Sequence, residues 1–176
     1  MKLSYKPRTK IISCIFVFLS VSFLLGELFG LYAIRQLSHN LDTIMGNFYT
    51  NQSIIGKFGK TLLFYLPCLF QLVHHRWFIL VPAALFYRGY VFSCSLAAMS
   101  YLNGEALGNL FSLIISAGAH TMSLTVLSSY LIYYLLVKQK YVFGNIAVER
   151  KLLFRSVCVA IFLFFVCMIS ELLIHN

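Results

Sequence analysis

The sequence predicts an all-α protein, a polytopic bundle of about five transmembrane helices in a single domain that covers residues 1–176. The 176-residue chain is 60% hydrophobic and only 11% charged, with a mean hydropathy of +0.84, whereas a soluble domain has about 25% charged residues. The apolar residues also come in long runs, and about 20 apolar residues are enough to cross a bilayer as a helix. Basic residues gather at the ends of these runs, as they do in membrane proteins.

The first apolar run covers residues 11–33 and follows the basic segment MKLSYKPRTK. A secretory signal peptide begins in the same way, but its apolar core has only about 7–15 residues and is followed by a small-residue cleavage site. This run is longer and no A-x-A site follows it, so we predict a retained first transmembrane helix. Residues 34–57 form the most polar stretch of the chain, and we expect an outer loop there.

The next three apolar runs depart from an ideal span. Residues 58–73 are short for a full crossing, and whether they cross the membrane completely stays open. Residues 77–99 form the third run, and residues 110–137 form a fourth that is longer than a core of about 30 Å requires. We expect the third helix to break at Arg88-Gly89, and the fourth either to tilt strongly or to break within the small-residue stretch 116–120.

The positions of Lys and Arg predict the orientation. A basic loop at 138–155 precedes the last run, residues 156–174. Five spans with a cytoplasmic N-terminus place ten Lys and Arg residues inside and three outside, in agreement with the positive-inside rule. We therefore predict a multi-pass membrane protein with a cytoplasmic N-terminus and its C-terminus outside. The inner set is Lys2, Lys6, Arg8, Lys10, Arg76, Lys138, Lys140, Arg150, Lys151 and Arg155, and the outer set is Arg35, Lys57 and Lys60.

Four polar residues inside the apolar runs are candidate functional residues: Glu27, Arg88, His120 and Glu171. A charge at the centre of a bilayer costs about 2.5–3.5 kcal/mol, so such residues usually face the bundle interior in pairs. We expect Arg88 to bind a carboxylate or the carbonyls freed by a helix break, with substrate or ion contact and snorkelling as alternatives. Glu27 and Glu171 lie near the outer ends of their runs, where water could solvate them.

Several function classes find no support in the sequence. The net charge of +9 would suit nucleic acid, but the basic residues flank apolar runs rather than form a soluble surface. The five cysteines lie inside apolar runs without a CxxC pair, so we expect no disulfide framework or metal site. The chain lacks HExxH, GxSxG and Walker A motifs.

Ser116 and Ser123 flank His120 and could be imagined as nucleophiles. No aspartate follows to orient the histidine, and serines in membrane helices more often form hydrogen bonds across the bundle. We therefore expect no catalytic residue, no metal and no cofactor.

Four stretches together resemble a family of small membrane proteins, the stage II sporulation protein M family. They are FLLGELFG at 23–30, LFYRGYVFS at 85–93, YLNGEALGNLFSLIISAGAH at 101–120 and CMISELLIHN at 167–176. They are similar to the family's glycine-x-x-x-glycine first helix, its basic residue before a glycine, its polar turn before a small-residue break, and its final helix with a glutamate. The family's proline–glutamine–asparagine break is replaced here by Ala117-Gly118-Ala119-His120.

This resemblance implies a non-enzymatic membrane scaffold. The family's namesake is required for engulfment of the forespore during sporulation, where it localises a cell-wall hydrolase and an activating membrane protein that thin septal peptidoglycan. The expected partners are thus other integral or membrane-anchored proteins and the lipid bilayer, without nucleic acid. The family carries no known catalytic residues, and the matching positions would be structural or partner-contacting: Gly26, Gly30, Arg88, Gly89 and Glu171.

An alternative is a small membrane subunit of a transporter, of the ABC or energy-coupling-factor type. Some relatives in the resembled family sit beside ABC transporter genes. Substrate-binding subunits of energy-coupling-factor transporters are similarly small and basic, but they usually have six segments and an alanine-rich first segment. Here the first segment is rich in Phe and Leu, which favours the scaffold.

Overall fold

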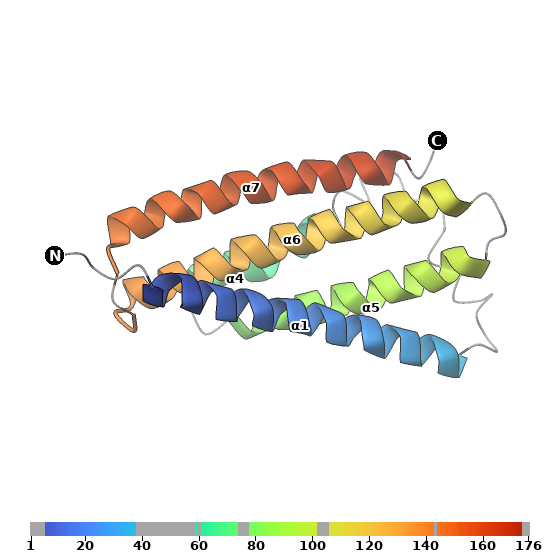
Figure 1. The fold of residues 1–176 in the computed structure, drawn as a ribbon, viewed down its shortest axis with the longest axis horizontal. Helices are drawn as coiled ribbons and strands as arrows, with labels where there is room; N and C mark the ends of the chain where they lie inside the picture. The colour runs from blue at the N-terminus through green and yellow to red at the C-terminus, as the bar shows by residue number, and fades with distance from the viewer. Residues whose placement is uncertain are drawn as a thin grey trace.

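The computed structural model describes residues 6–37, 59, 61–73, 78–101, 106–142 and 144–173. Within these ranges the regular structure is helical and no strand occurs, which confirms the all-α class. The named helices are α1 (Lys6–Leu37), α4 (Leu66–Val73), α5 (Leu80–Tyr101), α6 (Ala106–Lys138) and α7 (Ile146–Leu173), and Figure 1 shows the four long ones side by side.

Within the described part of the chain, four helices are long and apolar enough to span a membrane. The predicted second span, 58–73, contains a shorter apolar helix, Thr61–Gln71, and a full crossing by this segment stays a prediction. The four long apolar segments are Arg8–Gln36, Leu80–Ala97, Phe111–Lys138 and Ile146–Ser170.

Helices α1 and α5 run parallel to each other. Gly26 of α1 lies against the backbone of Phe86, and one turn further along, Gly30 lies against Tyr90. The contact therefore advances in the same direction on both helices.

Helix α6 runs antiparallel to α7. The Ser112 hydroxyl donates to the Ser170 carbonyl at 2.6 Å, and the Ser123 hydroxyl donates to the Ala160 carbonyl at 2.8 Å. Figure 1 shows α6 running opposite to α1, α5 and α7. The beginnings of α1 and α7 therefore lie at the same end of the molecule as the end of α6.

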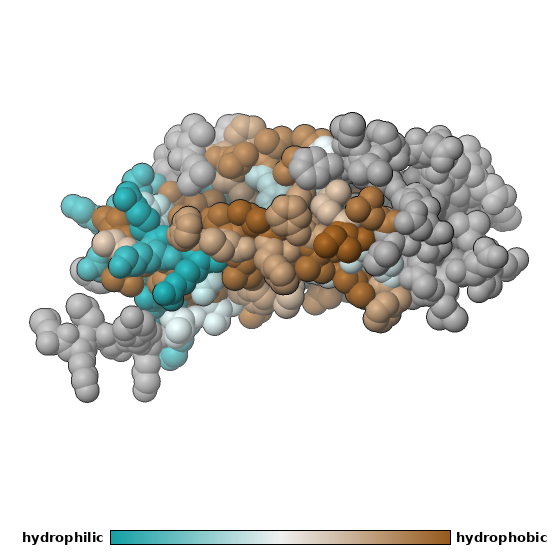
Figure 2. Space-filling view, turned by 90° about the horizontal axis from the view of Figure 1, so that it is seen from above, coloured by the Kyte–Doolittle hydropathy of each residue, from teal (hydrophilic) through white to brown (hydrophobic). Residues whose placement is uncertain are grey.

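Basic residues mark that end of the molecule. An ion pair joins the first turns of α1 and α7, with 3.4 Å between Arg8 Nη1 and Glu149 Oε1. On the face seen in Figure 2, hydrophilic side chains gather at this end and mostly hydrophobic ones cover the middle of the molecule. The exposed basic residues there are Lys10, Lys138, Lys140, Arg150, Lys151 and Arg155. They belong to the set assigned to the inner side, although the side that this end faces stays a prediction.

Helix α6 forms the centre of the bundle. Half of its apolar segment is buried, compared with 17–22% for the other three long segments. A hydrophobic core joins α1, α4, α5 and α6, and Leu153 of α7 packs against it; the core residues are Leu19, Cys68, Val81, Leu85, Leu124 and Leu131. The other long helices expose large apolar side chains around this centre, as helices do when one face contacts lipid.

The two predicted helix breaks are wrong. Helix α5 is continuous through Arg88-Gly89, and α6 is continuous through residues 116–120. Gly89 serves a close approach between helices, because an added Cβ would collide with the Phe23 carbonyl oxygen of α1. In α6, the serines near the predicted break bind neighbouring helices while the backbone stays helical.

The predicted basic loop at 138–155 is largely helical. Helix α6 ends at Lys138, and the turn after it includes Lys140 with φ of 62°, a left-handed conformation at the helix end. Helix α7 begins at Ile146, where the Asn145 side chain accepts a hydrogen bond from the Ala147 amide at 3.0 Å and caps the helix. Arg150, Lys151 and Arg155 therefore lie on a helix, because a helix need not end at the membrane boundary.

Candidate functional site

Three glycines form the contact between α1 and α5. A Cβ added to Gly26 would collide with the Phe86 carbonyl, and one added to Gly89 would collide with the Phe23 carbonyl. At Gly30, an added Cβ would lie 2.9 Å from the Tyr90 carbonyl oxygen. The structure thus brings Gly26, Gly30 and Gly89 together at one place where only glycine permits the backbones to approach.

Glu27 takes part in this contact through its backbone. The Ser93 hydroxyl of α5 donates to the Glu27 carbonyl at 2.8 Å, and Gly89 packs beside the Glu27 amide. The Glu27 side chain itself is half-buried. The hydrogen bond from Ser93 is a direct polar link between the two helices, of the kind that holds membrane helices together.

Arg88 projects from α5 toward the segment that precedes α4. Its guanidinium carbon lies 5.7 Å from the ring centroid of Phe64, within the range of a cation–π interaction. The Tyr87 ring stacks with the Phe64 ring, with 6.0 Å between the two ring centroids. The aromatic ring thus provides a favourable environment for the charge, while the predicted pairing of Arg88 with a carboxylate stays a prediction.

His120 occupies the interior of the bundle beside Phe64 and Tyr65. Its side chain is fully buried, and its ring centroid lies 5.5 Å from those of both Phe64 and Tyr65. Arg88 is close enough to interact electrostatically with it. Neither ring nitrogen of His120 has a hydrogen-bond partner among the described residues. The imidazole therefore retains a donor and an acceptor for a further group.

Ser123 links three segments of the chain through one hydroxyl group. Its oxygen lies 2.6 Å from the Tyr65 hydroxyl, and it donates to the Ala160 carbonyl of α7 at 2.8 Å. A serine has a single hydroxyl hydrogen. Because that hydrogen is used on the carbonyl, Tyr65 must donate to Ser123.

The two serines that flank His120 therefore bind neighbouring helices. Ser116 lies 3.3 Å from the Cys167 sulfur of α7, and Ser123 bridges Tyr65 and Ala160. Both serines are buried. Their hydrogen bonds across the bundle confirm the interpretation that serines in these membrane helices bond between helices.

Sequence reasoning missed Phe64 and Tyr65. Both lie in a short apolar segment whose contacts could not be predicted, because nothing in a uniformly apolar helix marks which face is inward. On α6, by contrast, the spacing of polar residues could have shown which face is inward. Its serines at 112, 116 and 123, with His120 between them, recur at intervals of three or four residues and so share one helix face.

Glu171 can be placed only in part. Glu171 belongs to the last turn of α7, and its side chain lies outside the described residues. Among the described residues, no group of three His, Cys, Asp or Glu side chains is arranged to hold a metal ion.

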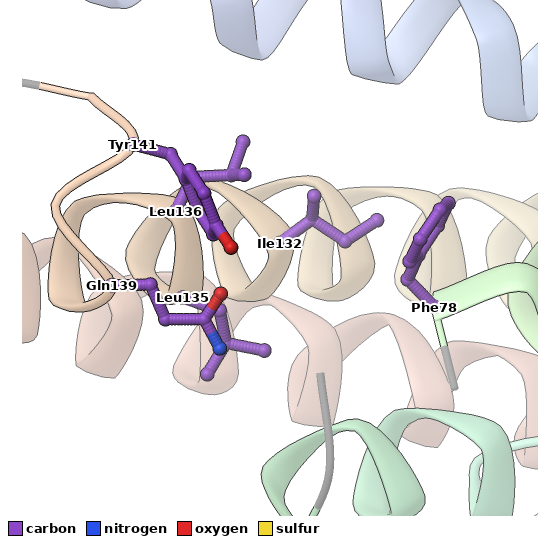
Figure 3. A pocket seen from close by; sticks show the side chains of 6 residues that line it. All are labelled: Phe78, Ile132, Leu135, Leu136, Gln139 and Tyr141. Atoms are coloured by element: carbon purple, nitrogen blue, oxygen red, sulfur yellow. The ribbon is translucent and has the colours of Figure 1, made fainter. Parts of the chain in front are cut away.

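A separate apolar pocket of about 470 Å³ lies at the end of α6. Figure 3 shows Phe78 and Tyr141 at opposite ends of a row of side chains from the end of α6 and the turn after it. The row consists of Ile132, Leu135, Leu136 and Gln139. The pocket carries no charged side chain, so it offers space without a polar group that would select a charged ligand.

The fold defines an all-α protein with four helices that are long and apolar enough to cross a membrane. No family model, curated protein or solved structure matched the chain. The resemblance to the stage II sporulation protein M family therefore stays a prediction.

Proposed function

We propose that this chain is a non-enzymatic scaffold of the bacterial cell membrane that organises other membrane proteins. The observation that supports this proposal is the use of interior polar groups for packing. Ser112, Ser116 and Ser123 all bind α7, and Ser93 binds α1. A scaffold needs a rigid bundle, and interhelical hydrogen bonds with close glycine contacts provide one.

The partners proposed for this scaffold are membrane proteins of a peptidoglycan-degrading complex that acts during sporulation and engulfment. The resemblance of the four sequence stretches motivates this choice. The outer face of α7 offers a broad contact surface for them. Its exposed large side chains follow one side of the helix: Phe154, Ile161, Phe162, Phe165 and Ile169.

Photo-crosslinking in native membranes tests the scaffold. A photoreactive amino acid at Phe162, which is 67% exposed, should capture a discrete membrane protein identified by mass spectrometry. The same amino acid at Leu131, which is 3% exposed, is the matched buried control and should capture none. A peptidoglycan hydrolase or a sporulation membrane protein among the products supports the proposal. Products that contain only lipid or the chain itself would contradict it.

A second candidate is a membrane subunit of a transporter, and His120 is the observation that favours it. Its imidazole is fully buried with both nitrogens unpartnered among the described residues, beside Arg88 and the Tyr65 ring. Ionisable residues in this position often mark the path of a transported substrate or ion. Co-purification of an ATP-hydrolysing subunit, together with loss of substrate uptake in His120→Ala, would favour the transporter over the scaffold.

A further inference from the structure

A groove separates α1 from α7 near the basic end of the molecule. It has a volume of about 610 Å³, within the roughly 300–1,000 Å³ that ligand pockets occupy. Ile12 and Phe16 of α1 form one wall, Tyr130 of α6 contributes to the floor, and Arg155 and Val159 of α7 form the other wall.

The ion pair between Arg8 and Glu149 lies at the end of the groove that is nearer the basic end of the molecule. It joins the first turns of α1 and α7 at 3.4 Å. Ile12, which lines the groove, lies four residues after Arg8. The groove therefore begins about one helical turn along α1 from the ion pair. The two helices pack on α6, which leaves this side of the groove open toward the surroundings of the bundle.

One cation belongs to an otherwise largely apolar groove. The Arg155 side chain is exposed and makes no hydrogen bond or ion pair with the residues that the structure describes. Lys151 is also exposed and lies four residues before Arg155, on the same helix face and nearer the basic end. The nearby Glu149 carboxylate is already bound to Arg8. The groove therefore complements a molecule with an apolar body and an anionic end.

The position of Arg155 in the sequence fits the headgroup region of a bilayer. It lies six residues after Glu149, which is about 9 Å along the helix, and it directly precedes the predicted last span, residues 156–174. A long side chain at this level reaches the interface while its stem stays along apolar surface. Basic pockets between transmembrane helices on the cytoplasmic side are known to bind anionic lipid headgroups.

We propose that this groove binds one anionic phospholipid of the adjacent leaflet. An acyl chain lies between Phe16 and Val159, and the phosphate binds the Arg155 guanidinium, with Lys151 as a second cation. A neutral lipid would leave Arg155 without a counter-charge. The proposal concerns a lipid site and does not rest on the scaffold function.

Native mass spectrometry of the full-length chain in mild detergent tests the site. Phosphatidylglycerol is added in one series and phosphatidylcholine with the same acyl chains in another, and the fraction of chain with one bound lipid is measured. We expect preferential retention of phosphatidylglycerol. We expect Arg155→Gln to weaken phosphatidylglycerol binding about fivefold, which corresponds to the loss of one basic residue near a membrane surface.

Two further variants keep the result interpretable. Arg35→Gln removes an exposed arginine from the last turn of α1, at the other end of that helix, and should bind the lipid like the wild type. Ser13→Phe fills the groove, since Ser13 lines it, and should weaken the binding of both lipids while Arg155 remains. Circular dichroism and size-exclusion profiles establish that each variant is folded.

Four results would overturn the proposal. They are equal retention of the two lipids by the wild type, unchanged lipid preference in Arg155→Gln, an equal loss in Arg35→Gln, and displacement of the lipid by inorganic phosphate. The third would mean that net charge and not the groove attracts the lipid. The last would mean that a free phosphate is the ligand.

Discussion

At the scale of single residues, the bundle interior is organised by hydroxyl groups that serve two partners. Ser123 is the clearest case, because it accepts from Tyr65 and donates to the Ala160 carbonyl. It thus connects the segment before α4 with α6 and α7. A hydrogen bond between membrane helices contributes on average about 0.6 kcal/mol. The loss of both bonds should therefore have a larger effect than the loss of one.

Ser123→Ala should lower the free energy of unfolding by about 1 kcal/mol, since it removes two interhelical hydrogen bonds. Tyr65→Phe should lower it by about half as much, because only the bond to Ser123 is lost. Unfolding in mixed micelles with increasing dodecyl sulfate measures both. Ser22→Ala is the control, because the Ser22 hydroxyl binds the Phe18 carbonyl of its own helix. A Tyr65→Phe variant less stable than Ser123→Ala would contradict this assignment of donor and acceptor.

Arg88 shows how a charge is accommodated without a break in its helix. Its guanidinium lies over Phe64, and Phe64 in turn stacks with Tyr87 and meets the edge of His120. A cation over an aromatic face gains about 0.5–2 kcal/mol, more when water is excluded. This gain offsets part of the insertion cost of about 2.5–3.5 kcal/mol for a central charge.

At the scale of helices, glycines have different roles in different helices. Gly26 and Gly89 each lie against a backbone carbonyl of the facing helix, whereas a Cβ added to Gly118 would have nothing within 4 Å. The close contact of α1 with α5 thus depends on its glycines, and the continuity of α6 does not depend on Gly118.

Gly26→Ala and Gly89→Ala should each destabilise the protein by about 1–3 kcal/mol, because the added methyl group forces α1 and α5 apart. Gly118→Ala should cause no loss, since the position is open and alanine favours a helix over glycine by about 1 kcal/mol. Thermal unfolding in detergent, followed by circular dichroism, compares the three. An equal loss in all of them would mean that helix flexibility, and not close packing, requires the glycines.

The sequence was sufficient to predict the existence of the helices but not their pairing. Long apolar runs bounded by basic residues indicate transmembrane helices because the bilayer requires that length and polarity. The partner of each helix depends on small local features, such as Gly26 against Phe86, that have no periodic signal in an apolar segment. The same small residues suggested breaks near Gly89 and Gly118, because glycine serves bends and close contacts equally well.

At the scale of the whole molecule, the short segment 61–73 explains how α1 and α5 can be parallel. Tyr65 bonds to Ser123, and three residues later Cys68 lies 3.1 Å from the Ser128 hydroxyl. The contact advances along α6 in its own direction, so the segment runs parallel to α6 and opposite to α1. It therefore leads the chain back toward the basic end, over part of the bundle's length.

This arrangement predicts that the two termini lie on opposite sides of the membrane. Helices α1, α5 and α7 run one way and α6 runs the other, so a reporter after Leu173 should face the side opposite to one after Lys138. With the basic end inside, as the positive-inside rule requires, alkaline phosphatase fused after Leu37 or Leu173 should be active and green fluorescent protein dark. After Lys138 the two reporters should give the reverse result. Fusions after Leu37 and Leu173 that report opposite sides would contradict the parallel arrangement of α1 and α7, and with it the return of the chain through residues 61–73.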